Sequence, residues 1–137
     1  MFSVSPLFFQ YVSYHWRVNN VCAYGEWLSI PEVADILNLQ QRDVRAALDR
    51  HELIAVRRGQ HNALAIHCEQ LVEEDGKIQI LPALHGTVVA LHDAGFTDNE
   101  ALDWLLRDEP ELEMTPLAAL HSGNIHAVRR IIIGLAF

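Results

Sequence analysis

The sequence predicts a mainly α-helical protein, in which a winged helix-turn-helix domain with a small β-hairpin wing precedes a compact helical domain. Three observations lead to this fold class. Two short segments with apolar stripes flank a tight turn after Leu28. A strand-turn-strand pattern with a basic tip follows them directly. After Pro82, apolar residues recur at helical spacing between clear capping residues.

The length and composition set the domain organisation. The chain has 137 residues, half of them hydrophobic and 20% charged, which is typical of a globular protein with one or two small domains. We expect an N-terminal extension over residues 1–25, the winged helix-turn-helix domain over 26–70, a connector over 71–81 and the helical domain over 82–137.

The N-terminal segment "MFSVSPLFFQYVSYHWRVNN" has no basic start and no small-residue cleavage site, so we do not expect a signal peptide. The alternation in "FFQYVSYHW" fits an edge strand, an unstructured extension or translation from an upstream start, and we favour an extension. No apolar run approaches the roughly 20 residues that span a bilayer. The only two cysteines, Cys22 and Cys68, do not make a disulfide framework, so we expect a reduced cytoplasmic protein.

The first helix of the pair begins with a strong capping signal. Ser29 and Glu32 have the spacing of a capping box, and Pro31 is tolerated in the first helical turn. One apolar face follows, formed by Val33, Ile36 and Leu37. Asn38 then fits a left-handed turn, which ends the helix.

The second helix is expected to start near Gln40 or Gln41. Its inner face is formed by Val44, Ala47 and Leu48, whereas Arg42, Arg45 and Asp49 point elsewhere. In "LIAVRRGQHNALAIH", which follows this helix, Ile54, Val56, Leu64 and Ile66 are strand-like and flank the turn-prone tip "RRGQHN". A hairpin at this place is a wing. In such a device the second helix enters the major groove of DNA and the wing contacts phosphates or the minor groove.

The charge distribution supports this interpretation. The whole chain has a formal net charge of -8, but residues 42–58 carry five arginines against three acids. From Pro82 onwards there are eight acidic residues against three arginines. The acidity therefore lies mainly outside the helix pair, where it limits indiscriminate DNA binding. Short helical pairs also occur in proteins that do not bind DNA, and arginines on a helix face are often simply solvated.

Four short helices are expected after Pro82. The first carries Leu84, Val88 and Leu91 and ends at Gly95. The second opens with a capping box of Thr97 and Glu100, contains the run "EALDWLLRD" and stops before Pro110. The third is capped by Thr115, with Pro116 at its first position, and ends at Gly123. The fourth is capped by Asn124 and has an apolar stripe formed by Val128, Ile131, Ile132 and Leu135.

Residues 26–137 resemble a small family of actinobacterial winged helix-turn-helix DNA-binding proteins, known best from mycobacteria. The resemblance rests on "WLSIPEVADILNLQQRDVRAALDRHELIAVRR" and "LPALHGTVVALHDAGFTDNEALDWLLRDEPEL", in the same order. It implies sequence-specific DNA binding by the first half and a helical C-terminal domain of poorly defined role.

The second half also resembles the toxin-binding domain of Xre/MbcA/ParS-type antitoxins, through "FTDNEALDWLLRDEPELEMTPLAALHSGNIHAV". In those proteins this domain grips a toxin that attacks NAD. The matching positions are Ala101, Leu102, Trp104, Leu105, Pro110, Leu112, Pro116, Leu117, Leu120, Gly123 and Val128. Most of them suit a core or a turn, so they support a shared fold more than a shared partner. The winged first half departs from the usual antitoxin helix-turn-helix domain.

No pattern indicates an enzyme, a cofactor or a metal site. The eight histidines form no HExxH motif and no zinc-type spacing with cysteine. His85 and His92 fall on one helical face and are interpreted as interface or surface residues. The acidic run "RDEPELE" has no partner base or nucleophile, and no phosphate-binding glycine loop is present.

The sequence thus predicts a cytoplasmic transcriptional regulator that binds double-stranded DNA. The alternative is an antitoxin-like protein whose helical domain inhibits a toxin. The helical domain is expected to bind a second copy of the chain or another protein. The residues expected to contact DNA are Gln41, Arg42, Arg45, Arg50, Arg57, Arg58, His61 and Asn62.

Overall fold

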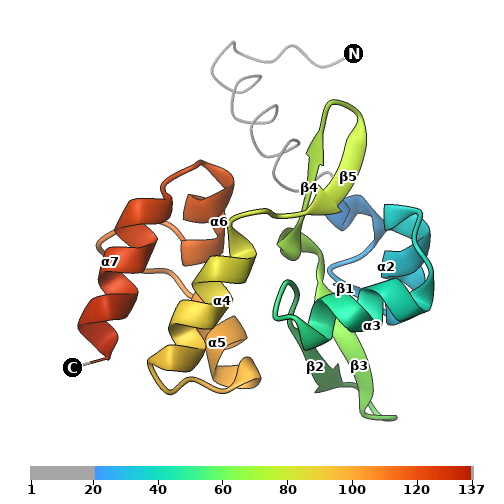
Figure 1. The fold of residues 1–137 in the computed structure, drawn as a ribbon, viewed down its shortest axis with the longest axis horizontal. Helices are drawn as coiled ribbons and strands as arrows, with labels where there is room; N and C mark the ends of the chain where they lie inside the picture. The colour runs from blue at the N-terminus through green and yellow to red at the C-terminus, as the bar shows by residue number, and fades with distance from the viewer. Residues whose placement is uncertain (1–20, 137) are drawn as a thin grey trace, which may run out of the picture.

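The computed structural model describes residues 21–136, which form two domains that lie side by side (Figure 1). The first contains η1 (Val21–Tyr24), β1 (Trp27–Leu28), α2 (Ile30–Leu37), α3 (Gln41–Asp49), β2 (Ala55–Arg58), β3 (Ala63–His67), η2 (Cys68–Gln70), β4 (Leu71–Glu74) and β5 (Lys77–Ile80). The second contains α4 (Leu84–Asp93), α5 (Asp98–Leu105), α6 (Pro116–His121) and α7 (Ile125–Leu135). The predicted fold class is confirmed. Within residues 21–136, no helix is both long and apolar enough to cross a membrane.

The first domain combines the helix pair with a three-stranded antiparallel sheet of order β1-β3-β2. The predicted wing is the β2–β3 hairpin, in which Ala55 pairs with Ile66 and Arg58 with Ala63. Strand β1 was not expected, because a two-residue strand is too short to show an alternating pattern. Its Leu28 pairs with Ile66, so β1 forms one edge of the sheet, just before α2 in the chain.

The capping residues at the ends of α2 act as the sequence indicates. The backbone N–H of Glu32 donates to Ser29 Oγ at 3.2 Å, and the N–H of Ser29 donates to Glu32 Oε1 at 2.9 Å. Asn38 has φ 57° and ψ 45°, a left-handed conformation that turns the chain toward α3. At the start of α3, the N–H of Gln40 donates to Asp43 Oδ2 at 3.1 Å. These contacts supply partners for N–H groups that a helix start otherwise leaves free.

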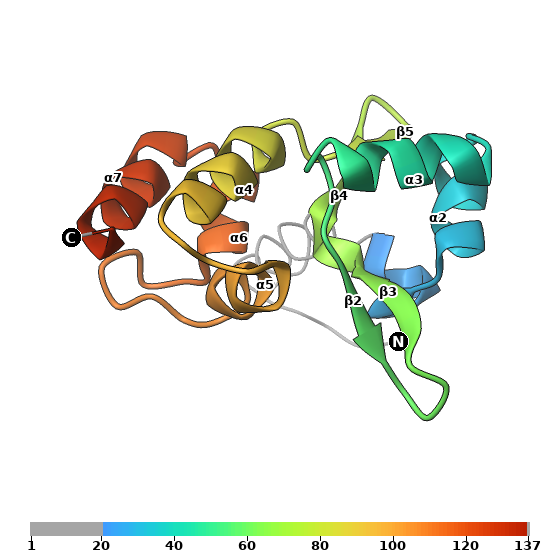
Figure 2. The same ribbon diagram turned by 60° about the horizontal axis from the view of Figure 1, so that its bottom comes forward.

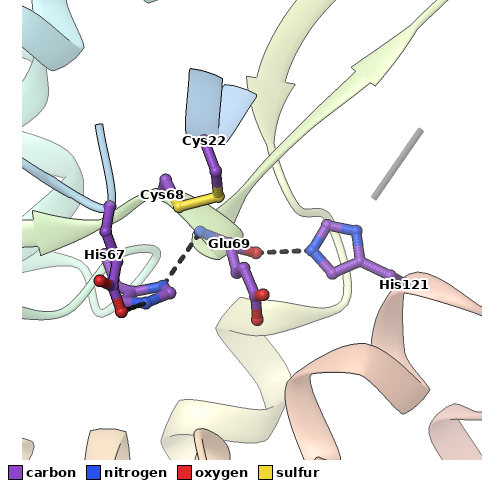
Figure 3. The surroundings of a disulfide bond; sticks show 6 residues. Cys22, His67, Cys68, Glu69 and His121 are labelled. Carbon is purple, nitrogen blue, oxygen red and sulfur yellow. Dashed lines mark hydrogen bonds and ion pairs between the residues drawn. A yellow bond between two sulfur atoms is a disulfide. The ribbon is translucent and has the colours of Figure 1, made fainter. Parts of the chain in front are cut away.

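The structure corrects two predictions near the N-terminus. Val21 is only 1% exposed and belongs to the core of the first domain, so the described part of the expected extension over 1–25 is built into that domain. Cys22 and Cys68 form a disulfide, which Figure 3 shows joining η1 to η2. The expectation of reduced cysteines was wrong because the fold brings η1 against the end of β3, a contact that sequence separation conceals. The alternating segment "FFQYVSYHW" lies outside the described residues.

The expected connector over 71–81 is mostly a second antiparallel hairpin, β4–β5. Its turn, at Asp75 and Gly76, has positive φ at both residues, as two-residue hairpin turns often require. Leu71 is fully buried in the core of the first domain, and Ile78 and Ile80 pack against the same core. This segment therefore extends the first domain rather than merely linking it to the second.

The four helices of the second domain follow the predicted punctuation. Gly95 and Gly123 take positive φ after α4 and α6, and Thr97 with Glu100 forms a capping box at α5. Thr115 caps α6 through the N–H of Ala118. Asn124 occupies the N-cap position of α7 without a side-chain capping bond. In the stripe of α7, Val128 and Ile132 are buried, whereas Leu135 is 46% exposed.

The two domains share packing and hydrogen bonds. Ile54, just before β2, is buried in the same cluster as the helices of the second domain, and Trp27, Val56 and Val72 pack against that cluster. Within the first domain, the buried amide of Gln70 accepts from the N–H of Ile54 at 2.7 Å and donates to its carbonyl at 2.9 Å, which holds this shared residue in place. His121 Nε2 lies 2.6 Å from the carbonyl oxygen of Glu69 (Figure 3). The start of the wing strand β2 therefore packs against the helical domain.

Candidate DNA-binding surface

Helix α3 divides its side chains between core and solvent. Val44 and Ala47 are at most 3% exposed and pack inside the first domain. Gln41, Arg42 and Arg45 are exposed, as their spacing on the helix requires. The same exposed side also carries Asp43 and Asp49. The structure therefore brings the three predicted contact residues of α3 onto one accessible face, although acidic groups interrupt the positive charge.

The turn ahead of α3 adds an apolar residue to this face of the domain. Leu39 is 46% exposed although it is large and hydrophobic. It follows the left-handed Asn38 and precedes the N-cap of α3, so it stands beside the helix start. The predicted site omits Leu39. Its signal in the sequence was weak, since a single leucine after a helix reads equally well as part of the core.

The wing tip is shaped by contacts of its own residues. The guanidinium of Arg57 donates from Nη1 to the carbonyl of Asn62 at 3.0 Å, which ties the two sides of the turn together. Gly59 has φ 80° and Asn62 has φ 53°, so both take the left-handed backbone that the tight tip needs. His61 is exposed between them. The four predicted wing residues, Arg57, Arg58, His61 and Asn62, thus gather at this tip.

Arg58 is held over an aromatic ring rather than extended freely into solvent. Its Cζ lies 4.0 Å from the ring centroid of Trp27, a cation–π arrangement. Trp27 in turn meets His67 edge-on, with ring centroids 4.8 Å apart. Trp27 is absent from the predicted site, and its only signal was an aromatic residue two positions before a helix cap. This contact holds the guanidinium of Arg58 against the ring of Trp27.

His67 packs against the ring of Trp27. It is only 5% exposed, and its Nδ1 accepts from the N–H of Glu69 at 3.2 Å. Its Nε2 lies 3.5 Å from a carboxylate oxygen of Glu26. Burial lowers the pKa of His67, against the opposing influence of Glu69 and Glu26 and with a further lowering from Arg58. Burial therefore favours the neutral form of this imidazole, which packs against Trp27.

Arg50 is placed differently from the other predicted arginines. It lies at the C-cap of α3, and its Nε is 2.7 Å from Glu52 Oε2. Hydrogen bonding and charge attraction from Glu52 raise the pKa of Arg50. Because this carboxylate offsets its charge, Arg50 attracts a phosphate less strongly than an unpaired arginine would.

The wing hairpin extends away from α3. In Figure 2, β2 and β3 run from the neighbourhood of α3 down to the wing tip. Beside the wing, a shallow groove separates it from α5 and is lined by Trp27, Val56, Arg57, Arg58, Asn99, Leu102, Asp103 and Leu106. Asp103 therefore brings a negative charge close to the base of the wing. Such an arrangement combines hydrogen-bonding side chains on a helix with cations on a flanking hairpin.

Two family descriptions match the chain, one for each domain. Residues 20–64 match the wHTH domain of the family described as "DNA-binding protein Rv2175c", and residues 81–136 match the Rv2175c C-terminal domain of unknown function. The order of the two matches agrees with the two domains of the fold, and the first match ends within β3.

A curated relative and a solved structure give the same result. The DNA-binding protein Rv2175c of Mycobacterium tuberculosis (strain ATCC 25618 / H37Rv) is 29% identical in an alignment 120 residues long that covers 79% of each chain. The NMR structure of Rv2175c superposes with a TM-score of 0.69 and 26% identity, covering 81% of each chain. Since both domains match in order and the fold agrees, this chain belongs to the Rv2175c family of winged helix-turn-helix proteins.

Proposed function

We propose that this protein binds double-stranded DNA in a sequence-specific manner and regulates transcription. The observation that carries the proposal is the exposed face of α3 with Gln41, Arg42 and Arg45, flanked by an arginine-bearing wing. Membership of a family whose wHTH domain is described as DNA-binding supports it. The mainly acidic helical domain is consistent with selective rather than general attraction to nucleic acid.

The proposal gives α3 the role of the base-reading helix. An arginine can donate two hydrogen bonds to guanine, and a glutamine can pair in the same way with adenine. Arg42 and Arg45 are suited to the first contact and Gln41 to the second. Leu39, beside the helix start, has the apolar character that contacts a thymine methyl group.

The wing has the role of a positioning element. Arg57 and Arg58 are held at the hairpin by Asn62 and Trp27, so they meet a phosphate or the minor groove with little loss of side-chain freedom. His61 and Asn62, at the tip, add hydrogen bonds to the DNA backbone. Arg50 is the weaker phosphate contact, because Glu52 already engages it.

A double substitution of α3 tests the proposal. Gel-shift titrations against genomic fragments should show that Arg42→Ala/Arg45→Ala binds at least about tenfold more weakly, because each lost bidentate contact is worth about 1–3 kcal/mol. The matched control is Arg107→Ala/Arg130→Ala, which removes two exposed arginines of the helical domain. Unchanged affinity of the α3 variant would sink the role of this helix, and no shift by the wild-type chain would sink the proposed function.

The salt dependence separates the wing from the helix. Removing a single phosphate contact lowers the slope of log K against log salt by about 0.9. We expect that change for Arg57→Ala with little change in the preferred sequence, whereas Arg42→Ala should alter the preference itself. A wing variant that changes sequence preference but not the salt slope would reverse these roles.

The helical domain is proposed to bind a second copy of the chain or another protein. Val89, Ile133 and Leu135 are between 37% and 63% exposed, and Ala90, Ala94 and Ile132 line a mainly apolar groove between α4 and α7. In the antitoxin-like alternative this domain inhibits a toxin. The positions that carry that resemblance, such as Leu102, Leu105 and Leu117, are buried, so they support the fold and assign no toxin-facing surface. Measuring the solution mass of wild type and Ile133→Asp tests self-association.

A further inference from the structure

Three side chains that can bind a metal ion meet where the two domains join. They are His51, which follows α3, His92 in the last turn of α4 and Asp98 at the first position of α5. One ligand atom from each lies within 4.8 Å of those of the other two. The cluster is separate from the proposed base-reading face, and the histidine pair comes from different domains.

Each side chain is delivered by a defined piece of backbone. His51 has φ 61°, a left-handed conformation that is uncommon for residues other than glycine and that turns the chain sharply out of α3. Its ring lies edge-on to that of His92, with centroids 4.6 Å apart. His92 Nε2 is 2.7 Å from Asp98 Oδ1, across the turn at Gly95 that joins α4 to α5. The three groups are therefore already oriented toward one another.

We propose that His51, His92 and Asp98 form a zinc-binding site that joins the two domains. Two imidazoles and one carboxylate are a donor set that suits Zn²⁺, whereas Mg²⁺ and Ca²⁺ prefer sites made only of oxygen ligands. Three protein ligands leave a fourth position for water, as in zinc sites that are open to solvent. The exposure of Asp98 agrees with such an open site.

The observed spacing is close to that of a zinc site, with one pair of ligand atoms closer together and the widest separation at most 4.8 Å. Bonds of about 2.0–2.1 Å place neighbouring ligand atoms about 3.4 Å apart in a tetrahedron. The 2.7 Å contact between His92 and Asp98 must open slightly, and the widest separation, at most 4.8 Å, must close. Rotation of side chains that sit on a turn and at two helix ends provides this adjustment without moving the buried core.

Bound zinc would connect the end of α3 to the helical domain. His51 comes two residues after Asp49, the last residue of α3, so its coordination restrains the C-terminal end of that helix. His92 and Asp98 belong to helices that pack in the core of the second domain. The ion therefore links the two domains across their boundary.

The direct test is a calorimetric titration of the full chain, freed of metal by chelation, with zinc sulfate. We expect one equivalent per chain in the wild type. His51→Asn, His92→Gln and Asp98→Asn should each weaken binding at least tenfold, since loss even of outer groups around a metal costs 10–100-fold. Asparagine at position 51 tolerates the left-handed backbone, so that variant preserves the turn.

The control is His85→Ala, which removes an exposed histidine from α4, the helix that carries His92. It should bind zinc as the wild type does. Zinc should also raise the thermal unfolding midpoint of the wild type and of His85→Ala but not that of His51→Asn. No stoichiometric binding by the wild type, or unchanged binding by His51→Asn, would overturn the proposed site and leave the DNA-binding proposal untouched.

Discussion

Helices α3 and α5 begin with similar capping contacts but have different roles in the fold. Asp43 in α3 and Glu100 in α5 each accept a hydrogen bond from the N-cap residue three positions earlier. Yet α5 buries four of its eight residues, whereas α3 buries two of its nine. Local capping therefore determines where a helix begins, and the width of its apolar face determines whether it becomes part of the core or presents a surface.

The two regions also differ in their charge. The stretch from α3 to the wing has an excess of arginine, whereas the helical domain has eight acids against three arginines. In spite of this difference the domains share a core through Ile54 and a hydrogen bond between His121 and the carbonyl of Glu69. The two regions therefore differ in surface charge but share one hydrophobic core. Substitutions in each region test how far the two unfold independently.

The largest expected effect comes from the disulfide, which only the first domain has. Cys22 and Cys68 are separated by 46 residues, and closing a loop of that size stabilises the folded chain by about 4 kcal/mol in the chain-entropy model. Urea unfolding should show this loss for Cys22→Ser. Reductant should lower the midpoint of the wild type to that of the variant and leave the variant unchanged. Equal midpoints with and without reductant would contradict a stabilising bond.

The next effect concerns the buried hydrogen bonds between Gln70 and Ile54, the residue through which the first domain packs against the helices. Gln70→Leu leaves the N–H and carbonyl of Ile54 buried without their partners, at a cost of about 3 kcal/mol in the free energy of unfolding. Gln79→Leu is the matched control, because Gln79 is exposed on β5 and should change stability by less than about 0.5 kcal/mol. Similar losses in the free energy of unfolding for both variants would show that the hydrogen bonds between Gln70 and Ile54 contribute little.

A smaller effect compares the capping boxes directly. Ser29→Ala in the first domain and Thr97→Ala in the second should each cost about 1 kcal/mol. Because the domains share a core, calorimetry should show a single transition that shifts in both variants. Two transitions, each moved by only one of the substitutions, would mean that the regions unfold independently.

The smallest effect is a pH dependence within the first domain. Burial lowers the pKa of His67 from its ordinary value of 6.5, so the unfolded chain binds a proton more readily than the folded one. This contribution to stability is complete above that ordinary value and is lost as the pH falls from there through the folded-state pKa.

The variant that isolates this group is His67→Asn. Asparagine can still accept from the N–H of Glu69, as His67 does, but does not titrate. Between about pH 7.5 and pH 5.5, its unfolding midpoint should therefore fall less than that of the wild type. An identical fall in both chains would assign the dependence to other groups.

Much of the fold was accessible from the sequence because its signals are local. The capping boxes, the left-handed Asn38 and the glycines after α4 and α6 each act within a few residues, and all took the predicted conformation. The positions of the wing strands followed from the alternation around the basic tip. Predictions that depend on a few neighbouring residues therefore held in both domains.

The features that escaped prediction depend on contacts between distant segments. The Cys22–Cys68 bond, strand β1 and the packing of Trp27 beneath Arg58 all require the sheet to be assembled first. Likewise, His51 and His92 have no motif spacing, and only the docking of the two domains brings them together. Sequence patterns identified the candidate contact residues of α3 and the wing, but not what holds them in place.

The stack of Arg58 on Trp27 gives the wing an optical reporter. Indole emission responds to a nearby charge and to solvent, and Trp27 is only partly buried beneath the guanidinium. Trp104, by contrast, is 7% exposed in the core of the other domain and is shielded from such events. If a ligand draws Arg58 away from the ring, the fluorescence of Trp27 changes, and comparison with a Trp27→Phe chain separates this change from the emission of the other two tryptophans.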